Sequence, residues 1–347
     1  MEFDHEEIVI RRGRRSGLFT IVAVHSTALG PSLGGCRMWS YTDAVAALRD
    51  ALRLSEGMTY KAAVAGLPQG GGKGVIVVEP GQRLAGEARR AALLDFAETV
   101  NAVDGRYITA EDVGVSPEDI LVCSEITSHV SALPLANGGS GDPSVWTALG
   151  VQVSIEVACE RAFGTADLSG RSVAVIGLGH VGADLARRLH AAGAQLVVSD
   201  INAERRAVAA ELGATWADPA DALFAEVDVL APCALGAAFD AETVPRLHAR
   251  VVAGAANNQL SEPWVDQVLV AHDVLWVPDF VVNAGGIVNI ASEFDGGYDP
   301  VRAEHDVRAI GDTVRLILDE AAAKRITPLA AAMAIARRRV AAGDPTA

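Results

Sequence analysis

The chain of 347 residues is acidic, with 44 Asp and Glu residues against 29 Lys and Arg and a formal net charge of -15. Such a balance argues against nucleic acid and anionic membranes as main partners, because both require a basic surface. Hydrophobic residues make up 50% of the chain and 34 residues are glycine, a composition typical of well-packed domains with many turns. The length suffices for about two domains, and we expect a soluble protein that binds a small molecule.

The four cysteines are scattered without a C-x-x-C pair, and no histidines stand near them at the spacing of metal ligands. This pattern predicts reduced, mostly buried thiols and no metal site. The first seven residues, Met-Glu-Phe-Asp-His-Glu-Glu, are acidic and contain no apolar signal segment. No apolar run approaches the roughly 18 residues of a membrane span, and we therefore expect a cytoplasmic protein.

The N-terminal region begins with two segments rich in Ile, Val, Phe and Thr, at 7–10 and 18–25, which predict a pair of strands. Residues 29–39 contain the pair Gly34-Gly35 and predict a loop. This loop is either a plain turn or one whose backbone N–H groups face an anion.

Thr42 and Asp43 predict the N-cap of a helix that reaches Lys61. A second lysine, Lys73, stands between three glycines and the β-branched strand 75–78, so a tight glycine turn would deliver its amine to the start of that strand. Two ammonium groups held together in a partly dry cleft disfavour each other's charge, so one of them would act as a base near neutral pH. The lysine pair thus predicts an active site.

Two other interpretations of this segment exist. A phosphate-binding P-loop is excluded, because Leu67 occupies the position of its first glycine and Gly74 stands where Ser or Thr would bind magnesium. A surface turn with two solvated lysines fits the segment equally well, since lysine is mostly exposed in proteins. The remaining segments of the chain decide between the turn and the active site.

An amphipathic pattern predicts a helix over 86–103, and the apolar segment after it predicts a strand from Tyr107 that ends on two acids, Glu111 and Asp112. Adjacent acids at a strand end usually cap the next helix, here one that begins at Pro117. Asp112 could instead reach the lysine pair and take part in proton transfer. By itself the local pattern favours the cap.

The segment 137–143, Asn-Gly-Gly-Ser-Gly-Asp-Pro, is the strongest break in composition and predicts a linker between domains. We expect an α/β substrate-binding and catalytic domain over 1–136 and a Rossmann-type dinucleotide-binding domain over 137–324. A long helix is predicted over 300–323, and the C-terminal helix within 325–347 is expected to pack on the first domain.

Residues 171–182 predict a short strand that leads into G-x-G-x-x-G and then into an amphipathic helix. A second strand follows and ends on Asp200, 18 residues after the last glycine, and this context identifies a nucleotide-binding turn. Gly177 permits the tight turn, Gly179 lets the backbone approach the pyrophosphate, and Gly182 lets helix and strand pack. Asp200 would bind the ribose hydroxyls, although a simple turn acid is the alternative.

Three further strands are predicted, over 227–230, 251–254 and 274–277. Each ends in small or polar residues, and ligands of open parallel sheets bind at the carboxyl ends of the strands. Asn257, Asn258 and Asn283 are therefore placed to meet the nicotinamide half of a dinucleotide.

Seven segments together carry a more specific signal: 29–38, 57–62, 70–76, 107–114, 177–182, 253–259 and 278–286. With these segments the chain resembles, nearly end to end, the amino-acid dehydrogenase family that includes the leucine, valine and phenylalanine dehydrogenases, with glutamate dehydrogenase a more distant relative. The glycine-lysine segment combined with Ala-Glu-Asp-Val-Gly is specific to this family. The dinucleotide fingerprint is shared by many oxidoreductases.

The resemblance implies roles for individual residues. Lys73 is the catalytic lysine, Asp112 handles protons at the substrate amino group, and Lys61 with the backbone of Gly34 holds the substrate carboxylate. The substrate-binding residues it implies are Gly34, Lys61, Met58, Leu33, Ala110, Asn258, Ile287 and Ile290. The residues it implies for NAD are Thr147, Gly177, Gly179, His180, Val181, Gly182, Asp200, Ile201, Cys233, Ala234, Ala255, Asn257 and Asn283. Trp146 departs from the family pattern, in which a smaller residue usually precedes the threonine.

The resemblance further implies NAD-dependent oxidative deamination of an apolar L-amino acid to the 2-oxo acid and ammonia, and the reverse reductive amination, by a homo-oligomer. A branched-chain substrate is favoured, and an aromatic one, phenylalanine or tryptophan, is the alternative. A protein that senses nicotinamide nucleotides without turnover is disfavoured because Lys61, Lys73 and Asp112 are all retained. A scaffold protein is disfavoured by the many polar residues at strand ends.

Overall fold

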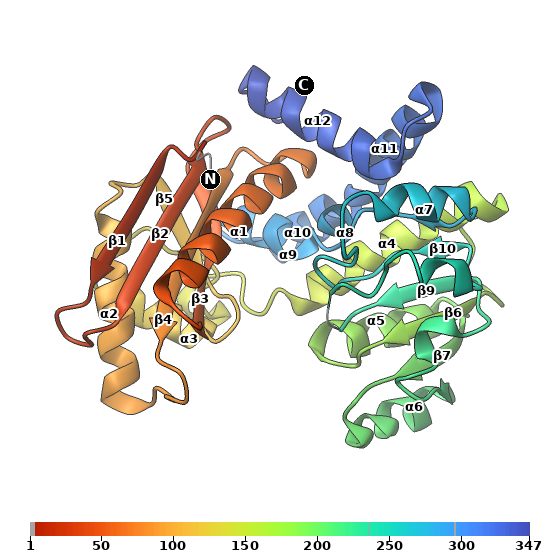
Figure 1. Cartoon of the computed structure of the whole chain (residues 1–347), viewed down its shortest axis with the longest axis horizontal. Helices are drawn as coiled ribbons and strands as arrows, with labels where there is room; N and C mark the ends of the chain where they lie inside the picture. The colour runs from red at the N-terminus through yellow and green to blue at the C-terminus, as the bar shows by residue number, and fades with distance from the viewer. Residues whose placement is uncertain (1–3, 235, 295) are drawn as a thin grey trace. The chain divides into compact units, whose positions relative to one another are not determined.

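The computed structural model describes residues 4–234, 236–294 and 296–347 (Figure 1). Two compact units make up the chain. Unit 1 comprises residues up to 142 together with 290–300 and 335–347, and unit 2 comprises 143–289 and 301–334. The expected division into 1–136 and 137–324 did not anticipate that residues 290–300 group with the N-terminal unit.

A five-stranded mixed sheet forms the centre of the described part of unit 1, in the order β1-β2-β4-β3-β5. Its strands are β1 (Glu7–Arg12), β2 (Phe19–Ser26), β3 (Ser32–Ser40), β4 (Gly70–Val78) and β5 (Tyr107–Ala110). β1 pairs antiparallel with β2, which confirms the predicted pair of strands. β3 runs parallel to both β4 and β5, so the loop predicted over 29–39 is wrong. Gly34 and Gly35 lie within this strand, and the pairing of β3 with β4 is interrupted between Leu33 and Cys36.

The helices of unit 1 begin at local capping signals. α1 (Ala44–Val64) follows Asp43, whose side chain accepts a hydrogen bond from the Ala46 N–H, as predicted. α2 (Gly86–Asn101) confirms the predicted second helix. α3 (Pro117–Cys123) is capped by Ser116 in a reciprocal arrangement with Asp119. The expectation that the acids at 111 and 112 cap this helix is therefore wrong.

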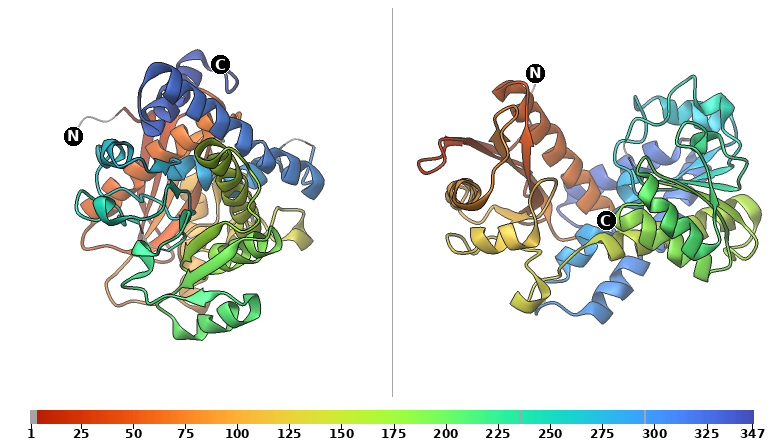
Figure 2. Two further views of the ribbon diagram at one scale, coloured as in Figure 1. Left: turned by 90° about the vertical axis from the view of Figure 1, so that its right-hand side faces the viewer. Right: turned by 90° about the horizontal axis from the view of Figure 1, so that it is seen from below.

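The two faces of this sheet pack against different helices, because side chains alternate along a strand (Figure 2). On one face Ala23 and Val75 pack with Ala47 and Leu52 of α1. On the other face a larger core that includes Ile76 packs with α2. Odd-numbered residues of β4 thus point toward α1 and even-numbered residues toward α2. Lys73 belongs to the α1 face and lies inside β4, so its predicted place at the start of the strand is wrong.

A six-stranded parallel sheet forms the centre of the described part of unit 2, in the order β11-β10-β9-β6-β7-β8. Its strands are β6 (Ser172–Ile176), β7 (Gln195–Ser199), β8 (Thr215–Trp216), β9 (Val229–Pro232), β10 (Val251–Val252) and β11 (Leu275–Trp276). Val173, Ala174 and Val175 are all buried, so both faces of the sheet are covered. Counted from β6, this order is that of a doubly wound dinucleotide-binding sheet, which confirms the predicted Rossmann-type domain.

The helices that follow the linker are α4 (Ser144–Phe163), α5 (His180–Ala191), α6 (Arg206–Leu212), α7 (Val265–Ala271), α8 (Asp279–Val282), α9 (Gly285–Ala291), α10 (Pro300–Arg308), α11 (Ile310–Lys324) and α12 (Pro328–Ala342). The single helix predicted over 300–323 is wrong in one respect, since α10 and α11 are separate helices with Ala309 between them. Residues 335–347, which include most of α12, belong to unit 1. There Arg339 donates hydrogen bonds to the carbonyl oxygens of Ala63 and Val64, at 3.0 and 2.8 Å, in the last turn of α1.

All four cysteines are free thiols, three of them buried, as expected from their scattered positions. In the described part of the chain, no helix combines the length and the apolar character that a membrane span requires.

Candidate active site

The register of the sheet in unit 1 brings two of the predicted catalytic residues together. Leu33 pairs with Gly71 of β4 and Gly35 pairs with Ala110 of β5, so odd-numbered residues of β3 and β4 share the α1 face with even-numbered residues of β5. Lys73 belongs to this face, and Asp112 follows Ala110 by two residues. The Lys73 Nζ donates to the Asp112 Oδ2 at 2.7 Å, across 39 residues of sequence. The structure thus joins the glycine-lysine segment to the Ala-Glu-Asp-Val-Gly segment.

This ion pair is held away from bulk water on the lysine side. The Lys73 side chain is 5% exposed and that of Asp112 is 24% exposed. Burial would raise the pKa of Asp112, but the positive charges of Lys73 and Arg37 and their hydrogen bonds outweigh burial and lower it. Asp112 is consequently a carboxylate at neutral pH. This contact confirms the alternative in which Asp112 reaches the lysine instead of capping the next helix.

Two glycines allow this close arrangement. A Cβ at Gly35 would lie 2.3 Å from the Glu111 carbonyl oxygen and 2.7 Å from the Asp112 Cβ. A Cβ at Gly71 would lie 2.1 Å from the backbone nitrogen of Thr59 in α1. Any larger side chain at either position would push the Asp112 segment or α1 away from Lys73.

The residues expected at the substrate carboxylate lie on two elements next to this pair. Lys61 and Met58 are three residues apart on α1, share one face of it and are half-buried. The Gly34 carbonyl oxygen in β3 accepts a hydrogen bond of 2.6 Å from the buried Tyr107 hydroxyl. α1 covers the face of the sheet on which Lys73 lies. The roles of Lys61 and Gly34 toward a substrate stay predictions.

An apolar cluster in unit 1 contains three of the four residues predicted for the side-chain pocket. Leu33, Ala110 and Ile290 pack together with Ala132, and all four are buried. Ala132 is new, and its backbone φ of 57° lies in the left-handed region. Nothing in its local sequence indicated this position. Ile287 precedes Ile290 by three residues in α9, is buried and belongs to unit 2.

Arg37 is a second residue that the sequence did not reveal. Its Nε donates to the Asp112 Oδ2 at 3.0 Å and its Nη1 donates to the Asp50 Oδ2 at 3.0 Å. Side chains two residues apart in a strand share a face, so Arg37 lies on the same face as Gly35 and Lys73. This signal was missed because residues 29–39 were predicted to be a loop.

The glycine motif of unit 2 forms a tight turn between β6 and α5. Gly177 has a φ of 96°, and a Cβ on it would lie 2.8 Å from the Cβ of Ala234. A Cβ at Gly182 would lie 1.8 Å from the Gly177 carbonyl oxygen and 3.2 Å from the Cβ of Cys233. Gly179 is the N-cap residue of α5. The turn therefore aims a helix N-terminus at the end of β6, where a pyrophosphate is held in folds of this order.

Asp200 stands at the end of the neighbouring strand β7 and faces this turn. Its Oδ2 accepts a hydrogen bond of 2.6 Å from the Leu178 N–H, inside the glycine motif. Its Oδ1 accepts one of 2.7 Å from the Asn202 N–H. The carboxylate is thus fixed beside the turn with lone pairs left for ribose hydroxyls. Of the neighbours predicted with it, His180 is exposed, Val181 is half-buried and Ile201 is 91% exposed.

The predicted nicotinamide end contains a buried acceptor that the protein does not satisfy. The Asn283 Nδ2 donates to the Ala255 carbonyl oxygen at 3.1 Å and to the Asn257 Oδ1 at 2.8 Å. The Asn283 Oδ1 is buried and has no hydrogen-bond partner among the described residues. A buried orphan acceptor is costly, and a carboxamide N–H₂ group such as that of nicotinamide would satisfy it.

Two further predicted residues lie near this end of unit 2. The Thr147 hydroxyl donates to the Pro143 carbonyl oxygen at 3.1 Å in the first turn of α4. A Cβ at Gly286 would lie 3.0 Å from the Thr147 Oγ1, so α4 and α9 pack closely there. Asn258 has a left-handed φ of 54° after β10. Together with the glycine turn and Asp200, these residues fit a dinucleotide.

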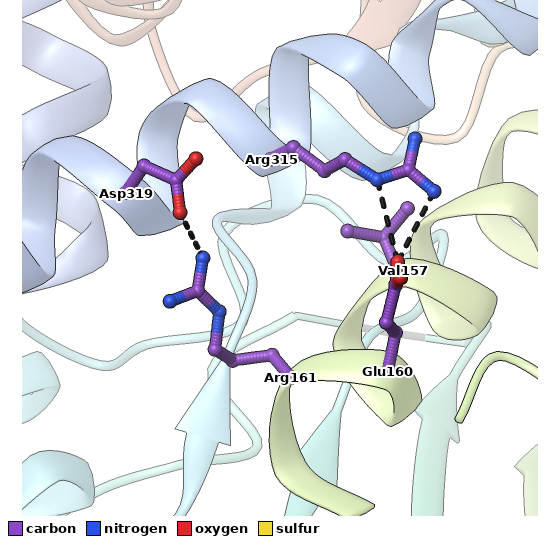
Figure 3. Close-up of a pocket in the computed structure, with 5 residues that line it drawn as sticks. All are labelled: Val157, Glu160, Arg161, Arg315 and Asp319. Atoms are coloured by element: carbon purple, nitrogen blue, oxygen red, sulfur yellow. Dashed lines mark hydrogen bonds and ion pairs between the residues drawn. The ribbon is translucent and has the colours of Figure 1, made fainter. Parts of the chain in front are cut away.

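A surface pocket between α4 and α11 of unit 2 is a different feature (Figure 3). Arg315 donates to the Glu160 Oε2 at 3.2 and 3.3 Å, and Arg161 pairs with Asp319. Val157 completes the lining. None of the predicted site residues lies in it, and exposed ion pairs of this kind contribute little to stability.

The doubly wound sheet, the glycine turn with its acid and the buried lysine-carboxylate pair define the class of a nucleotide-dependent oxidoreductase. Residues 5–129 match the model of the Glu/Leu/Phe/Val dehydrogenase dimerisation domain. Residues 198–343 match that of Glutamate/Leucine/Phenylalanine/Valine dehydrogenase. Residues 152–240 also match the NAD-binding domain of D-isomer specific 2-hydroxyacid dehydrogenases.

Individual relatives are similar over almost the whole chain. A leucine dehydrogenase of Bacillus cereus is 43% identical over 342 residues, which cover 98% of this chain and 92% of the relative. A valine dehydrogenase of Streptomyces virginiae is 41% identical over 340 residues, 97% of this chain and 94% of the relative. The crystal structure of L-tryptophan dehydrogenase from Nostoc punctiforme superimposes with a TM-score of 0.84 at 38% identity, covering 98% of this chain and 97% of that one.

The chain belongs to the Glu/Leu/Phe/Val dehydrogenase family. The resemblance inferred from the sequence motifs is thereby confirmed, as are the two-domain α/β fold and the assignment as an amino-acid dehydrogenase. Its cofactor is NAD.

Proposed function

We propose that this enzyme oxidises a branched aliphatic L-amino acid, leucine, valine or isoleucine, to the 2-oxo acid and ammonia, and catalyses the reverse reductive amination. The observation that carries the proposal is the buried ion pair of Lys73 and Asp112 next to the apolar cluster of Leu33, Ala110 and Ile290. The pair supplies proton chemistry, and the cluster supplies a neighbouring apolar surface for a side chain.

Each residue of the pair takes one proton-transfer role. Asp112 is ionised at neutral pH and can accept a proton from the substrate amino group. Lys73 would handle the protons of the water that converts the imino acid to the 2-oxo acid. Bound NAD supplies the hydride acceptor. Lys61 and the Gly34 backbone would hold the substrate carboxylate.

The apolar cluster supports an aliphatic substrate. Leu33, Ala110, Ala132 and Ile290 offer no polar partner, so a charged side chain would be buried unpaired. Ile290 and Leu33 are bulky, which suggests that this apolar surface leaves room for a side chain of moderate size only. The names of the leucine and valine dehydrogenase relatives agree with this substrate class.

An aromatic substrate is the second candidate. It is favoured by the similarity to the structure of L-tryptophan dehydrogenase. Discrimination between apolar side chains is weak, because one methylene is worth only about 1–3 kcal/mol, and two members of the cluster are alanines.

A substrate panel tests the proposal directly. NADH formation is followed by absorbance with leucine, valine, isoleucine, phenylalanine, tryptophan and glutamate. We expect the highest kcat/KM for one of the branched aliphatic substrates and no turnover of glutamate. A preference for phenylalanine or tryptophan would establish the second candidate, and no NADH formation with any amino acid would overturn the proposed function.

We also propose that the protein assembles as a homo-oligomer through unit 1, because the model matched by residues 5–129 is described as a dimerisation domain. Light scattering after size-exclusion chromatography tests this. A monomer at micromolar concentration would contradict it.

A further inference from the structure

The carboxylate of Asp112 receives both of its described side-chain hydrogen bonds on one oxygen. The Lys73 Nζ and the Arg37 Nε donate to Oδ2 at 2.7 and 3.0 Å. Arg37 lies on β3 and pairs with Val75 of β4. Val75 follows Lys73 by two residues, so Arg37 and Lys73 share one face of the sheet. The other oxygen, Oδ1, receives neither of these hydrogen bonds, and the Asp112 side chain is 24% exposed.

Arg37 is itself anchored at its other end. Its Nη1 donates to the Asp50 Oδ2 at 3.0 Å, in α1. That carboxylate also accepts from the Tyr41 hydroxyl at 2.8 Å and from the Arg53 Nη2 at 3.0 Å. A planar guanidinium with donors in a fixed fork is suited to bridge two carboxylates in this way.

The anchoring carboxylate remains charged. Burial would raise the pKa of Asp50, but hydrogen bonds from Tyr41 and Arg53 and the charge of Arg37 outweigh burial and lower it. The positively charged Arg37 therefore lies between two carboxylates, Asp50 on α1 and Asp112 beside Lys73.

We infer that Arg37 is a positioning residue of the proposed reaction: anchored on Asp50, it turns the Asp112 carboxylate so that Oδ2 pairs with Lys73 and Oδ1 faces the substrate amino group. This inference rests on the proposed function. It adds a residue that touches neither substrate nor cofactor in that proposal and acts through Asp112.

Loss of the positive charge at position 37 changes the pH at which the Asp112 carboxylate becomes protonated. The titratable and charged groups that act on Asp112 or lie beside it are Lys73, Arg37, Cys36, Tyr41, Asp50, Tyr107 and Glu111. Lys73 and Arg37 lower the pKa of Asp112 against burial. Without Arg37 that pKa rises, and the ionised form is lost at a higher pH as the solution is acidified.

The titration of Glu111 must be distinguished from that of Asp112. Burial, with the charges of Asp112 and Asp142, raises the pKa of Glu111 to about 7. Its titration would overlap an acidic limb that has moved toward neutral pH. A Glu111→Gln background removes this group from the profile.

The experiment compares Arg37→Gln, Arg37→Lys and Asp50→Asn in the wild-type and Glu111→Gln backgrounds, with kcat and KM of the preferred amino acid measured from about pH 4 to about pH 10, so that the range reaches down to the expected limb. For Arg37→Gln we expect an acidic limb shifted upward by about 1–3 pH units, the usual effect of a neighbouring arginine. We also expect kcat at neutral pH to fall by about 10²-fold through misplacement of the carboxylate. Arg37→Lys keeps the positive charge but loses the paired donors of the guanidinium. The acidic limb of its pH profile should therefore shift less than that of Arg37→Gln, while kcat still falls.

Asp50→Asn tests the anchor without touching the Arg37–Asp112 contact. We expect a lower kcat and a smaller displacement of the limb than in Arg37→Gln. Arg15→Gln is the matched control, because Arg15 donates to the buried Asp95 at 3.1 Å in the same unit and has no described contact with Asp112. Its pH profile should match that of the wild type.

Circular dichroism and NADH fluorescence titration establish that each variant is folded and binds cofactor. Folded Arg37→Gln and Arg37→Lys with wild-type kcat and an unshifted acidic limb would overturn the inference, even if their melting temperatures fall. If Arg37→Gln does not fold, the same criterion applies to Arg37→Lys and Asp50→Asn. A wild-type enzyme that forms no NADH with any amino acid would instead show failure of the proposed function.

Discussion

The two units hold their functional groups by different physical means. In unit 2 the glycine turn depends on a close approach of backbone segments that leaves no room for a side chain. A Cβ at Gly182, for example, would lie 1.8 Å from the Gly177 carbonyl oxygen. In unit 1 the candidate site is made by side chains, Lys73 of β4 and Asp112 of the segment after β5. A local motif can specify a backbone turn, whereas a side-chain pair depends on the register of a whole sheet. The two units should therefore respond differently to substitution.

The largest expected effect is in unit 1. Lys73→Ala should lower kcat by at least about 10²-fold, because a positioned acid–base group and the partner of Asp112 are lost. NADH binding should persist, since the residues predicted to bind the dinucleotide belong to unit 2. Kinetics with saturating substrate and fluorescence titration with NADH measure both. Lys324→Ala, which removes a surface lysine paired with Glu320, is the control, and turnover near the wild-type level in Lys73→Ala would refute the proposed mechanism.

A side chain decides the cofactor preference within unit 2. Asp200 can accept from a ribose 2′-hydroxyl but repels a 2′-phosphate, so kcat/KM should favour NAD over NADP by at least about tenfold. The nearby Arg206 lies over the Trp216 ring, 4.7 Å from its centroid. Steady-state kinetics with both cofactors provides the measurement. Equal values would show that Arg205 and Arg206, and not the aspartate, determine the preference.

A backbone position in unit 2 should give a moderate effect on binding without an effect on folding. A Cβ at Gly179 meets no protein atom within 4 Å, so Gly179→Ala should keep the melting temperature of the wild type. The added methyl would stand where the pyrophosphate approaches, and we expect NADH affinity to fall about tenfold, or about 1.4 kcal/mol. Gly182→Ala is the contrast, since it should destabilise the fold itself. Unchanged affinity in Gly179→Ala would show that the phosphates do not contact this residue.

The smallest effect is expected at the surface pocket of unit 2. Asp319→Asn removes the partner of Arg161 in an exposed pair, so the melting temperature should change by no more than about 2 °C. kcat and KM should equal those of the wild type. A loss of activity in this variant would give the pocket between α4 and α11 a functional role that its paired charges do not indicate.

The sequence by itself determined the features whose signals are local. Asp43 caps α1 as predicted, β7 ends directly before Asp200 as predicted, and the glycine motif leads from β6 into α5. A cap, an apolar run and a glycine turn each depend on a few consecutive residues. The family motifs added the residues proposed for the site.

Only the tertiary structure decided the arrangement around Lys73. β3 begins with three buried residues and contains the pair Gly34-Gly35, so its sequence resembles a loop and its alternation was not recognised. Once β3 lies between β4 and β5, the period of two puts Arg37 and Asp112 on the face of Lys73. Ala132 joins Leu33 and Ile290 through the folding of distant segments onto one another. Register and long-range packing depend on the burial of the whole sheet, which no short stretch of sequence encodes.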